Sequence, residues 1–215
     1  MTPSVFETAG KKEYTLEPEE INLREIARYL GYRNETPDER VGSGIESAVS
    51  RLAEVSRAKA VWQSFPLTEE NGRLLFAGMG TESRDLAVNL KNCSSVILFA
   101  ATLGSGPDIL IRRAQIGRIS DAVILQSASA AMIEAVCDRL NEELREEAEK
   151  AGFTLHPRYS PGYGDFSLEY QKDLIRILNA GKEIGLSLTE GLLMTPGKSV
   201  TAVIGAEISP KSDET

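Results

Sequence analysis

The sequence predicts an α+β domain. Segments whose apolar residues recur at helical spacing are interspersed with short apolar or alternating segments typical of strands, and no regular β-α-β rhythm connects them. The chain has 215 residues, of which 41% are hydrophobic and 26% charged. This length and composition are typical of one globular domain with a substantial core.

The amino-terminal third is expected to contribute helices and a hairpin. Residues 1–13 are polar and aperiodic and are predicted to form a flexible tail, while residues 14–75 are assigned to the same domain as the rest of the chain. Apolar spacing and turn residues predict a helix over about 19–31, a helix over 42–59, a strand over 58–66 and a hairpin strand over 73–78.

Residues 76–208 are expected to form the core of the domain, with a second flexible tail over 209–215. Thr81 or Ser83 can cap a helix over 83–91, and the glycines at 104 and 106 predict a turn. The other predicted elements are a central strand over 93–103, a long amphipathic helix over about 120–150, a short helix over 167–180, and strands over 184–191 and 198–205 joined by a loop over 192–197.

The charge balance narrows the choice of partners. The chain carries 24 Lys and Arg against 32 Asp and Glu, a net charge of −8, which disfavours a nucleic-acid backbone. No apolar run such as SSVILFAATLG is long enough to span a bilayer, and no signal peptide is visible. Cys93 and Cys137 are far apart in the sequence. We therefore expect a cytoplasmic chain with reduced thiols, no membrane association and no nucleic-acid partner.

The sequence lacks the residue patterns of several common metal-binding, nucleotide-binding and catalytic sites. His156 is the only histidine, so the usual zinc or facial-triad metal sites are not supported. The glycine clusters at 78–80 and 104–106 match neither the dinucleotide-binding fingerprint nor a P-loop, and no nucleophile elbow is present. We therefore predict no acid–base or nucleophilic catalytic residue.

The segment RYSPGYGDFSLEYQK, residues 158–172, is the clearest candidate for ligand binding. Arg158 offers a fork of donors that matches a carboxylate, and Tyr159 and Tyr163 offer aromatic faces and hydroxyls. Pro161 and Gly162 favour a sharp turn that can expose backbone groups to a ligand. The set suits a zwitterionic amino acid attached to a flat base or a sulfonium, although the same residues also suit a turn that serves only packing.

Glu134 lies on a stripe of small or polar residues along the predicted long helix. Small residues allow a ligand or another backbone to approach closely, and a carboxylate among them can attract a cation. Tight packing of helix against sheet, with Glu134 at the wet rim, explains the stripe equally well. The stripe consists of Ser127, Ala130, Ala131, Glu134, Cys137, Asp138 and Asn141.

Two motifs resemble the activation domain of cobalamin-dependent methionine synthase. The family carries R-x-x-P-G-Y, which matches residues 158–163, and further on L-T-E-x-x-x-M-x-P-x-x-S-V, which matches residues 188–200. The segments ILFAATLG and SASAAMIEAVCDRLNEEL are similar to the family's central strand and long helix. The likeness covers roughly residues 75–205 and implies a twisted, mainly antiparallel sheet flanked by helices.

The resemblance also implies a function. The family domain binds S-adenosylmethionine in a shallow groove and docks over cobalamin that has been oxidised to its inactive Co(II) form. An electron from a donor such as flavodoxin and the methyl group of S-adenosylmethionine then restore methylcobalamin. No side chain of the domain acts as a general base in this process.

The site residues that the resemblance implies can be placed one by one. The family's arginine falls on Arg158, the backbone contact beside it on Tyr159, its tyrosine on Tyr163 next to Gly162, and an acidic residue of its long helix on Glu134. The loop that would face the corrin and the partner protein falls on Met194, Thr195, Pro196 and Gly197.

The sequence departs from the family at some positions. A second acidic position falls on Gly152, so its contact is absent or supplied by Glu149, and the amino-terminal acidic contact has no clear match. No cobalamin-binding, homocysteine or folate module is recognisable. We therefore expect a free-standing activation domain that acts on a corrinoid protein carried by another chain. The alternatives are an interaction or repair module that does not use S-adenosylmethionine, and an unrelated small-molecule methyltransferase or hydrolase.

Overall fold

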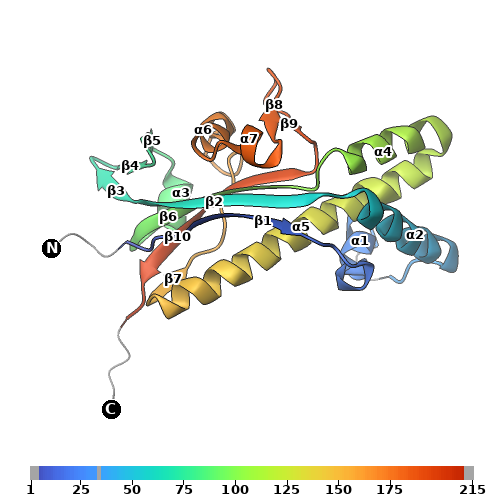
Figure 1. Cartoon of the computed structure of the whole chain (residues 1–215), viewed down its shortest axis with the longest axis horizontal. Helices are drawn as coiled ribbons and strands as arrows, with labels where there is room; N and C mark the ends of the chain where they lie inside the picture. Colours follow the sequence, from blue (N-terminus) through green and yellow to red (C-terminus); the bar gives the residue numbers. More distant parts are fainter. Residues whose placement is uncertain (1–4, 33–34, 211–215) are drawn as a thin grey trace, which may run out of the picture.

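A five-stranded antiparallel sheet forms the centre of the computed structural model, which describes residues 5–32 and 35–210 (Figure 1). Each strand runs antiparallel to its neighbours, as in the predicted α+β class. The order is β1 (Ala9–Tyr14), β2 (Ala58–Pro66), β6 (Cys93–Thr102), β10 (Ser199–Ile208) and β7 (Phe153–Leu155). Two smaller antiparallel sheets are made by β3 (Thr68–Glu70), β4 (Arg73–Phe76) and β5 (Met79–Thr81), and by β8 (Ser187–Leu188) with β9 (Met194–Thr195).

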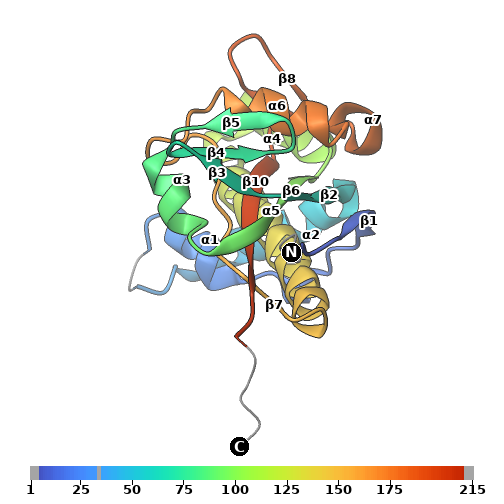
Figure 2. The same cartoon turned by 90° about the vertical axis from the view of Figure 1, so that its left-hand side faces the viewer.

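Helices cover both faces of the central sheet (Figures 1 and 2). Four helices, with a 3-10 turn at Pro18–Glu20, pack on one face, and three short helices and the β3–β5 sheet pack on the other. The first group is α1 (Leu23–Tyr29), α2 (Glu39–Val55), α4 (Gly106–Gly117) and α5 (Ile119–Lys150). The second group is α3 (Arg84–Asn89), α6 (Tyr170–Ile177) and α7 (Ala180–Ile184).

The apolar run of β6 is explained by this three-layer arrangement. Ile97 and Phe99 point into the core under α5, whereas Leu98 and Ala100 point into the core under α6 and α7. All four side chains are fully buried, because β6 lies between β2 and β10 with layers on both sides. The prediction of a central strand at 93–103 is therefore confirmed.

Helix α5 is long and apolar enough to cross a membrane by length and composition alone. However, Leu125, Met132, Val136, Leu140 and Leu144 are almost completely buried in the core. A long core helix meets the same criterion as a membrane span, and these contacts identify α5 as the core helix of this fold.

The prediction of a flexible tail over residues 1–13 is wrong for residues 9–13. These residues form most of β1, which pairs with β2 from the Ala9–Gln63 to the Tyr14–Ala58 position. β1 is an edge strand whose side chains are mostly exposed, so its sequence is polar although its backbone is paired. At the other end, Ser209 donates its backbone N–H to Gly152, and residues 211–215 of the predicted second tail lie outside the described residues.

The structure also corrects two predictions near the glycines and the carboxyl terminus. The turn at Gly104, with φ of 77°, is followed by α4, which begins at Gly106 and was not predicted. Of the strand predicted over 184–191, only Ser187 and Leu188 are in a strand, and Ile184 is the last residue of α7. β8 pairs with β9, which lies inside the predicted loop, and β10, the strand predicted over 198–205, inserts between β6 and β7.

Candidate functional site

Arg158 and Tyr159 are positioned by the part of the β10 edge that lies beyond its pairing with β7. The N–H of Tyr159 donates to the carbonyl of Val203 at 2.8 Å, and the N–H of Val203 donates back to Tyr159 at 2.9 Å. Side chains of successive residues in an extended segment point to opposite faces. Tyr159 accordingly packs with Phe166 on the α6 side, while Arg158 reaches α5 on the other side.

The turn after Tyr159 is held rigidly by its own backbone. Gly162, at φ of 95°, donates its N–H to the carbonyl of Phe166 at 2.7 Å, and Phe166 donates to Tyr163 at 3.0 Å. Phe166 is fully buried and stacks on Tyr170 with ring centroids 4.9 Å apart. Tyr163, by contrast, is 68% exposed, so its ring is free to contact a ligand.

Asp165 ties this turn to the beginning of α3. Its carboxylate accepts from the Ser83 hydroxyl, from the N–H of Arg84 at 2.8 Å and from the N–H of Asp85 at 3.2 Å. In return Asp85 accepts from the N–H of Asp165 at 3.1 Å. These bonds satisfy the otherwise unpaired N–H groups of the helix terminus and fix the loop in place.

We expect Asp165→Ala to increase the mobility of both the turn that contains residue 165 and the first residues of α3. The hydrogen bond from Ser83, followed by those from the backbone, holds the pKa of Asp165 below its ordinary value. A lowered folded-state pKa means that the stabilisation is present above the ordinary pKa and disappears as the pH falls through the folded-state value. Hydrogen exchange should show faster exchange at Arg84 and Asp85 in the variant at neutral pH. Unchanged exchange there would contradict this assignment.

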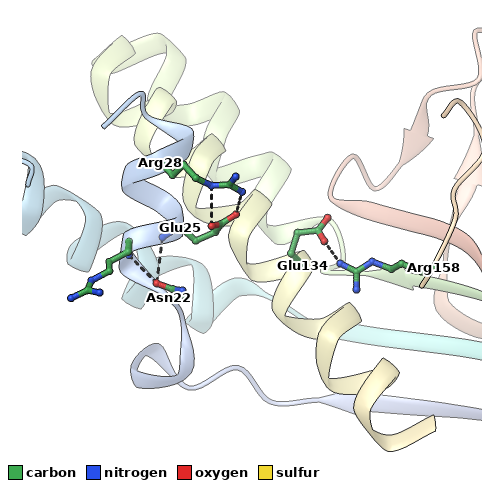
Figure 3. A network of polar contacts seen from close by, with 6 residues as sticks. Asn22, Glu25, Arg28, Glu134 and Arg158 are labelled. Atoms are coloured by element: carbon green, nitrogen blue, oxygen red, sulfur yellow. Dashed lines mark hydrogen bonds and ion pairs between the residues drawn. The ribbon is translucent and has the colours of Figure 1, made fainter. Parts of the chain in front are cut away.

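Arg158 is held between two carboxylates of α5. Its guanidinium donates to Glu134 at 2.5 Å (Figure 3). It also donates to Asp138 at 2.7 Å, and the two acidic residues lie one helical turn apart on α5. The Arg158 side chain is only 25% exposed. Burial works against its charge, but the bond to Asp138 and the nearby Glu134 outweigh it, and the pKa of Arg158 is raised. We call Arg158, Glu134 and Asp138 together the clamp. It contains a permanent cation, and its net charge is −1 when both carboxylates are ionised.

Two grooves meet at this clamp. The helix groove, of about 760 Å³, lies between α1 and α5 and includes Glu25, Arg28, Tyr29 and Asp138. The loop groove, of about 430 Å³, lies along the edge of β10. Both grooves are lined by Glu134 and Arg158, so the ion pair stands between them. The loop groove is lined by Glu134, Arg158, Tyr159, Ser160, Pro161, Tyr163, Gln171, Met194, Ser199, Val200 and Thr201.

The loop groove brings together five of the residues predicted from the sequence, and leaves four outside. Glu134, Arg158, Tyr159, Tyr163 and Met194 all line it. Gly162, Thr195, Pro196 and Gly197 do not.

The backbone of two predicted residues is already committed. The N–H of Gly197 donates to Asp108 of α4 at 2.7 Å. The backbone of Tyr159 pairs with Val203, so this residue offers the groove its side chain and the second lone pair of its carbonyl.

The second acidic group of the site is Asp138. Neither Gly152 nor Glu149, the two positions considered from the sequence, lines either groove. Asp138 was visible in the sequence as a member of the small and polar stripe, four residues after Glu134. Only the contact with Arg158, which comes from a distant segment, distinguishes it from its neighbours.

The fold and the groove define a class of protein, an α+β domain with a charged clamp beside a groove at the edge of its central sheet. Residues 94–212, more than half of the chain, match the family model described as vitamin B12 dependent methionine synthase, activation domain. The chain belongs to this family. A comparison with curated proteins found no match.

A solved structure shares the fold of the whole chain. It is described as the crystal structure of the MetH reactivation domain bound to AdoHcy, and it superposes with a TM-score of 0.69 at 18% sequence identity. The match covers 99% of this chain and 83% of that one. The predicted twisted antiparallel sheet with flanking helices is therefore confirmed as the fold.

Proposed function

We propose that this chain binds S-adenosylmethionine in the loop groove and supports the reductive remethylation of cobalamin held by a separate corrinoid methyltransferase. The observation that carries the proposal is the meeting of Glu134 from α5 with Arg158 and Tyr163 from the loop over 158–163 around one groove. Membership of the activation-domain family supports the same function, and the related MetH domain was crystallised with AdoHcy.

The charges of the clamp suit this ligand. S-adenosylmethionine carries a carboxylate, an ammonium and a sulfonium, so in the loop groove it can give its carboxylate to Arg158 and a cationic group to Glu134, while Asp138 adds its negative charge from the neighbouring helix groove. With a net charge of −1, the clamp favours a ligand of net charge +1 over the neutral S-adenosylhomocysteine. Product release after methyl transfer would then be assisted by the loss of the sulfonium charge.

The protein's part in the reaction is positioning. In the proposed reaction, a donor such as flavodoxin would supply one electron to the partner's cobalamin, and the methyl group would pass from the sulfonium to the reduced cobalt, with S-adenosylhomocysteine as the leaving group. This step needs no proton transfer, so the protein only has to hold the ligand in position. The charged pair of Arg158 and Glu134 and the aromatic ring of Tyr163 line the groove and can do this. Met194 lines the groove from the β8–β9 hairpin, whose connecting loop carries Leu193 at 69% exposure, and we propose that this hairpin faces the corrin and the partner.

Titration calorimetry with S-adenosylmethionine, followed by a reactivation assay with a Co(II) corrinoid protein and a reductant, tests the proposal. We expect saturable binding and the appearance of methylcobalamin. No binding at millimolar ligand would overturn the proposal and favour an interaction or repair module that does not use S-adenosylmethionine.

Tyr163→Ala is expected to weaken S-adenosylmethionine binding about tenfold. The exposed ring can cover a base, and removal of such a stacking ring costs roughly 1–3 kcal/mol. Tyr163→Phe keeps the ring and should bind nearly as the unmodified protein does. Val88→Ala is the matched control, because Val88 is 77% exposed on α3 and lines neither groove. Equal affinity of Tyr163→Ala and the control would exclude Tyr163 from the site.

A further inference from the structure

Two residues that line the loop groove have buried side-chain oxygens without hydrogen-bond partners. In the described part of the chain, five buried side-chain oxygens have no partner, and two of them, Gln171 Oε1 and Thr201 Oγ1, belong to residues that line this groove. Gln171 is 6% exposed and Thr201 is 2% exposed. An unpaired buried polar group costs about 1–3 kcal/mol, so two of them in one groove point to a ligand that completes their bonding.

The two side chains come from elements that meet at the groove. Gln171 lies in the first turn of α6, which packs over β10, and Thr201 lies on β10 two residues before Val203. Val203 uses its N–H and C=O to pair with Tyr159, and alternate residues of a strand turn these groups to the same side. The backbone of Thr201 therefore also faces the open edge, where the described residues supply no further strand.

We propose that Gln171 and Thr201 read the polar edge of an adenine ring bound in the loop groove. This inference rests on the proposed function, since it assigns the base of S-adenosylmethionine to this end of the groove. A glutamine amide matches adenine in a bidentate manner, because its oxygen accepts from the exocyclic amino group while its nitrogen donates to a ring nitrogen. The Thr201 hydroxyl can donate or accept at the same edge.

The rest of the groove fits a base in this position. Met194 and Val200 supply apolar lining, and the exposed ring of Tyr163 can cover the face of the base. Arg158 and Glu134 of the clamp line the same groove and take the charged end of the ligand. The groove thus offers polar readout for the base and ionic contacts for the amino acid.

Gln171 and Thr201 should determine specificity rather than stability. Replacing a buried, unpaired polar group by an apolar one of similar shape is nearly neutral or stabilising. We therefore expect Gln171→Leu and Thr201→Val to unfold at or above the temperature of the unmodified protein while they bind the ligand more weakly. A residue with a purely structural role would show the opposite pattern.

The test compares S-adenosylhomocysteine with S-inosylhomocysteine, in which a carbonyl replaces the amino group of the base, by titration calorimetry. We expect the unmodified protein to prefer the adenine compound at least tenfold. In Gln171→Leu its affinity should fall about 10- to 100-fold and the preference to less than about threefold, as expected for one bidentate contact. Thr201→Val should also weaken the adenine compound.

Asn141→Leu is the matched control, because Asn141 Oδ1 is also buried and unpaired but its residue lines neither groove. This variant should keep both the affinity and the preference. If Gln171→Leu and Thr201→Val bind S-adenosylhomocysteine as the control does, or if Gln171→Leu keeps the full preference, the inference is overturned and the proposed function stands. If the unmodified protein binds neither this compound nor S-adenosylmethionine, the proposed function falls and the inference falls with it.

Discussion

Replacing Arg158 by alanine is expected to weaken the binding of S-adenosylmethionine at least about 30-fold. The variant removes the partner of the ligand carboxylate and leaves Glu134 and Asp138, one turn apart on α5, without the cation between them. Truncation of one member of a hydrogen-bonded charge pair at a binding site costs roughly 2–5 kcal/mol, or about 30- to 4,000-fold in affinity. Titration calorimetry at ligand concentrations up to a hundred times the Kd of the unmodified protein measures the loss.

Two further variants separate charge from geometry. Arg158→Lys keeps the positive charge but not the planar fork that bridges two carboxylates, so its affinity should lie between those of the alanine variant and the unmodified protein. Arg145→Ala is the matched control, since Arg145 pairs with Glu142 on the exposed face of α5, the helix that also carries Glu134 and Asp138. An Arg158→Ala variant that binds within about threefold of this control would contradict the assignment of the clamp.

The loss should not come from unfolding. Glu134 and Asp138 have side chains that are 40% and 70% exposed, so water can solvate both when Arg158 is absent. Repulsion between like charges four residues apart on a helix amounts to only a few tenths of a kcal/mol. The thermal unfolding midpoint of Arg158→Ala is therefore expected to stay close to that of the unmodified protein.

The elements that the sequence predicted well are those whose burial leaves a strong pattern. β6 is buried on both faces and α5 buries a long stripe, and both appear in the sequence as apolar runs or helical spacing. β1 leaves no such pattern, because an edge strand is stabilised by backbone pairing while its side chains stay in water. α4 was missed because Gly104 and Gly106 indicate a turn, although Pro107 is well placed in the first turn of a helix.

Only part of the candidate site could likewise be predicted from the sequence. Arg158, Glu134 and Tyr163 could be proposed from the sequence because each is the kind of side chain that a charged, aromatic ligand requires. Asp138 could not be separated from the other polar residues of its stripe, since its role depends on the position of Arg158. Gln171 and Thr201 gave no signal, because a missing hydrogen bond becomes apparent only when the surrounding chain is folded.

Replacing Gly106 by alanine is expected to destabilise the protein by about 3 kcal/mol. A Cβ at this position would lie 2.1 Å from the carbonyl oxygen and 2.8 Å from the carbonyl carbon of Val55, at the end of α2. Because both atoms belong to the backbone, no side-chain rotation relieves the clash, and α2 and the beginning of α4 have to separate. The same separation disturbs Asp108, which holds Gly197 beside the groove.

The thermal unfolding midpoint measures this effect. For a protein of this size a loss of 3 kcal/mol corresponds to a decrease of about 6–12 °C. Gly117→Ala is the control, since Gly117 ends α4, has an ordinary backbone conformation, and would meet no atom within 4 Å of the new Cβ. It should be neutral or slightly stabilising because alanine restricts the unfolded chain more than glycine does. Equal midpoints for the two variants would show that α2 and α4 do not approach as closely as the contact at Val55 requires.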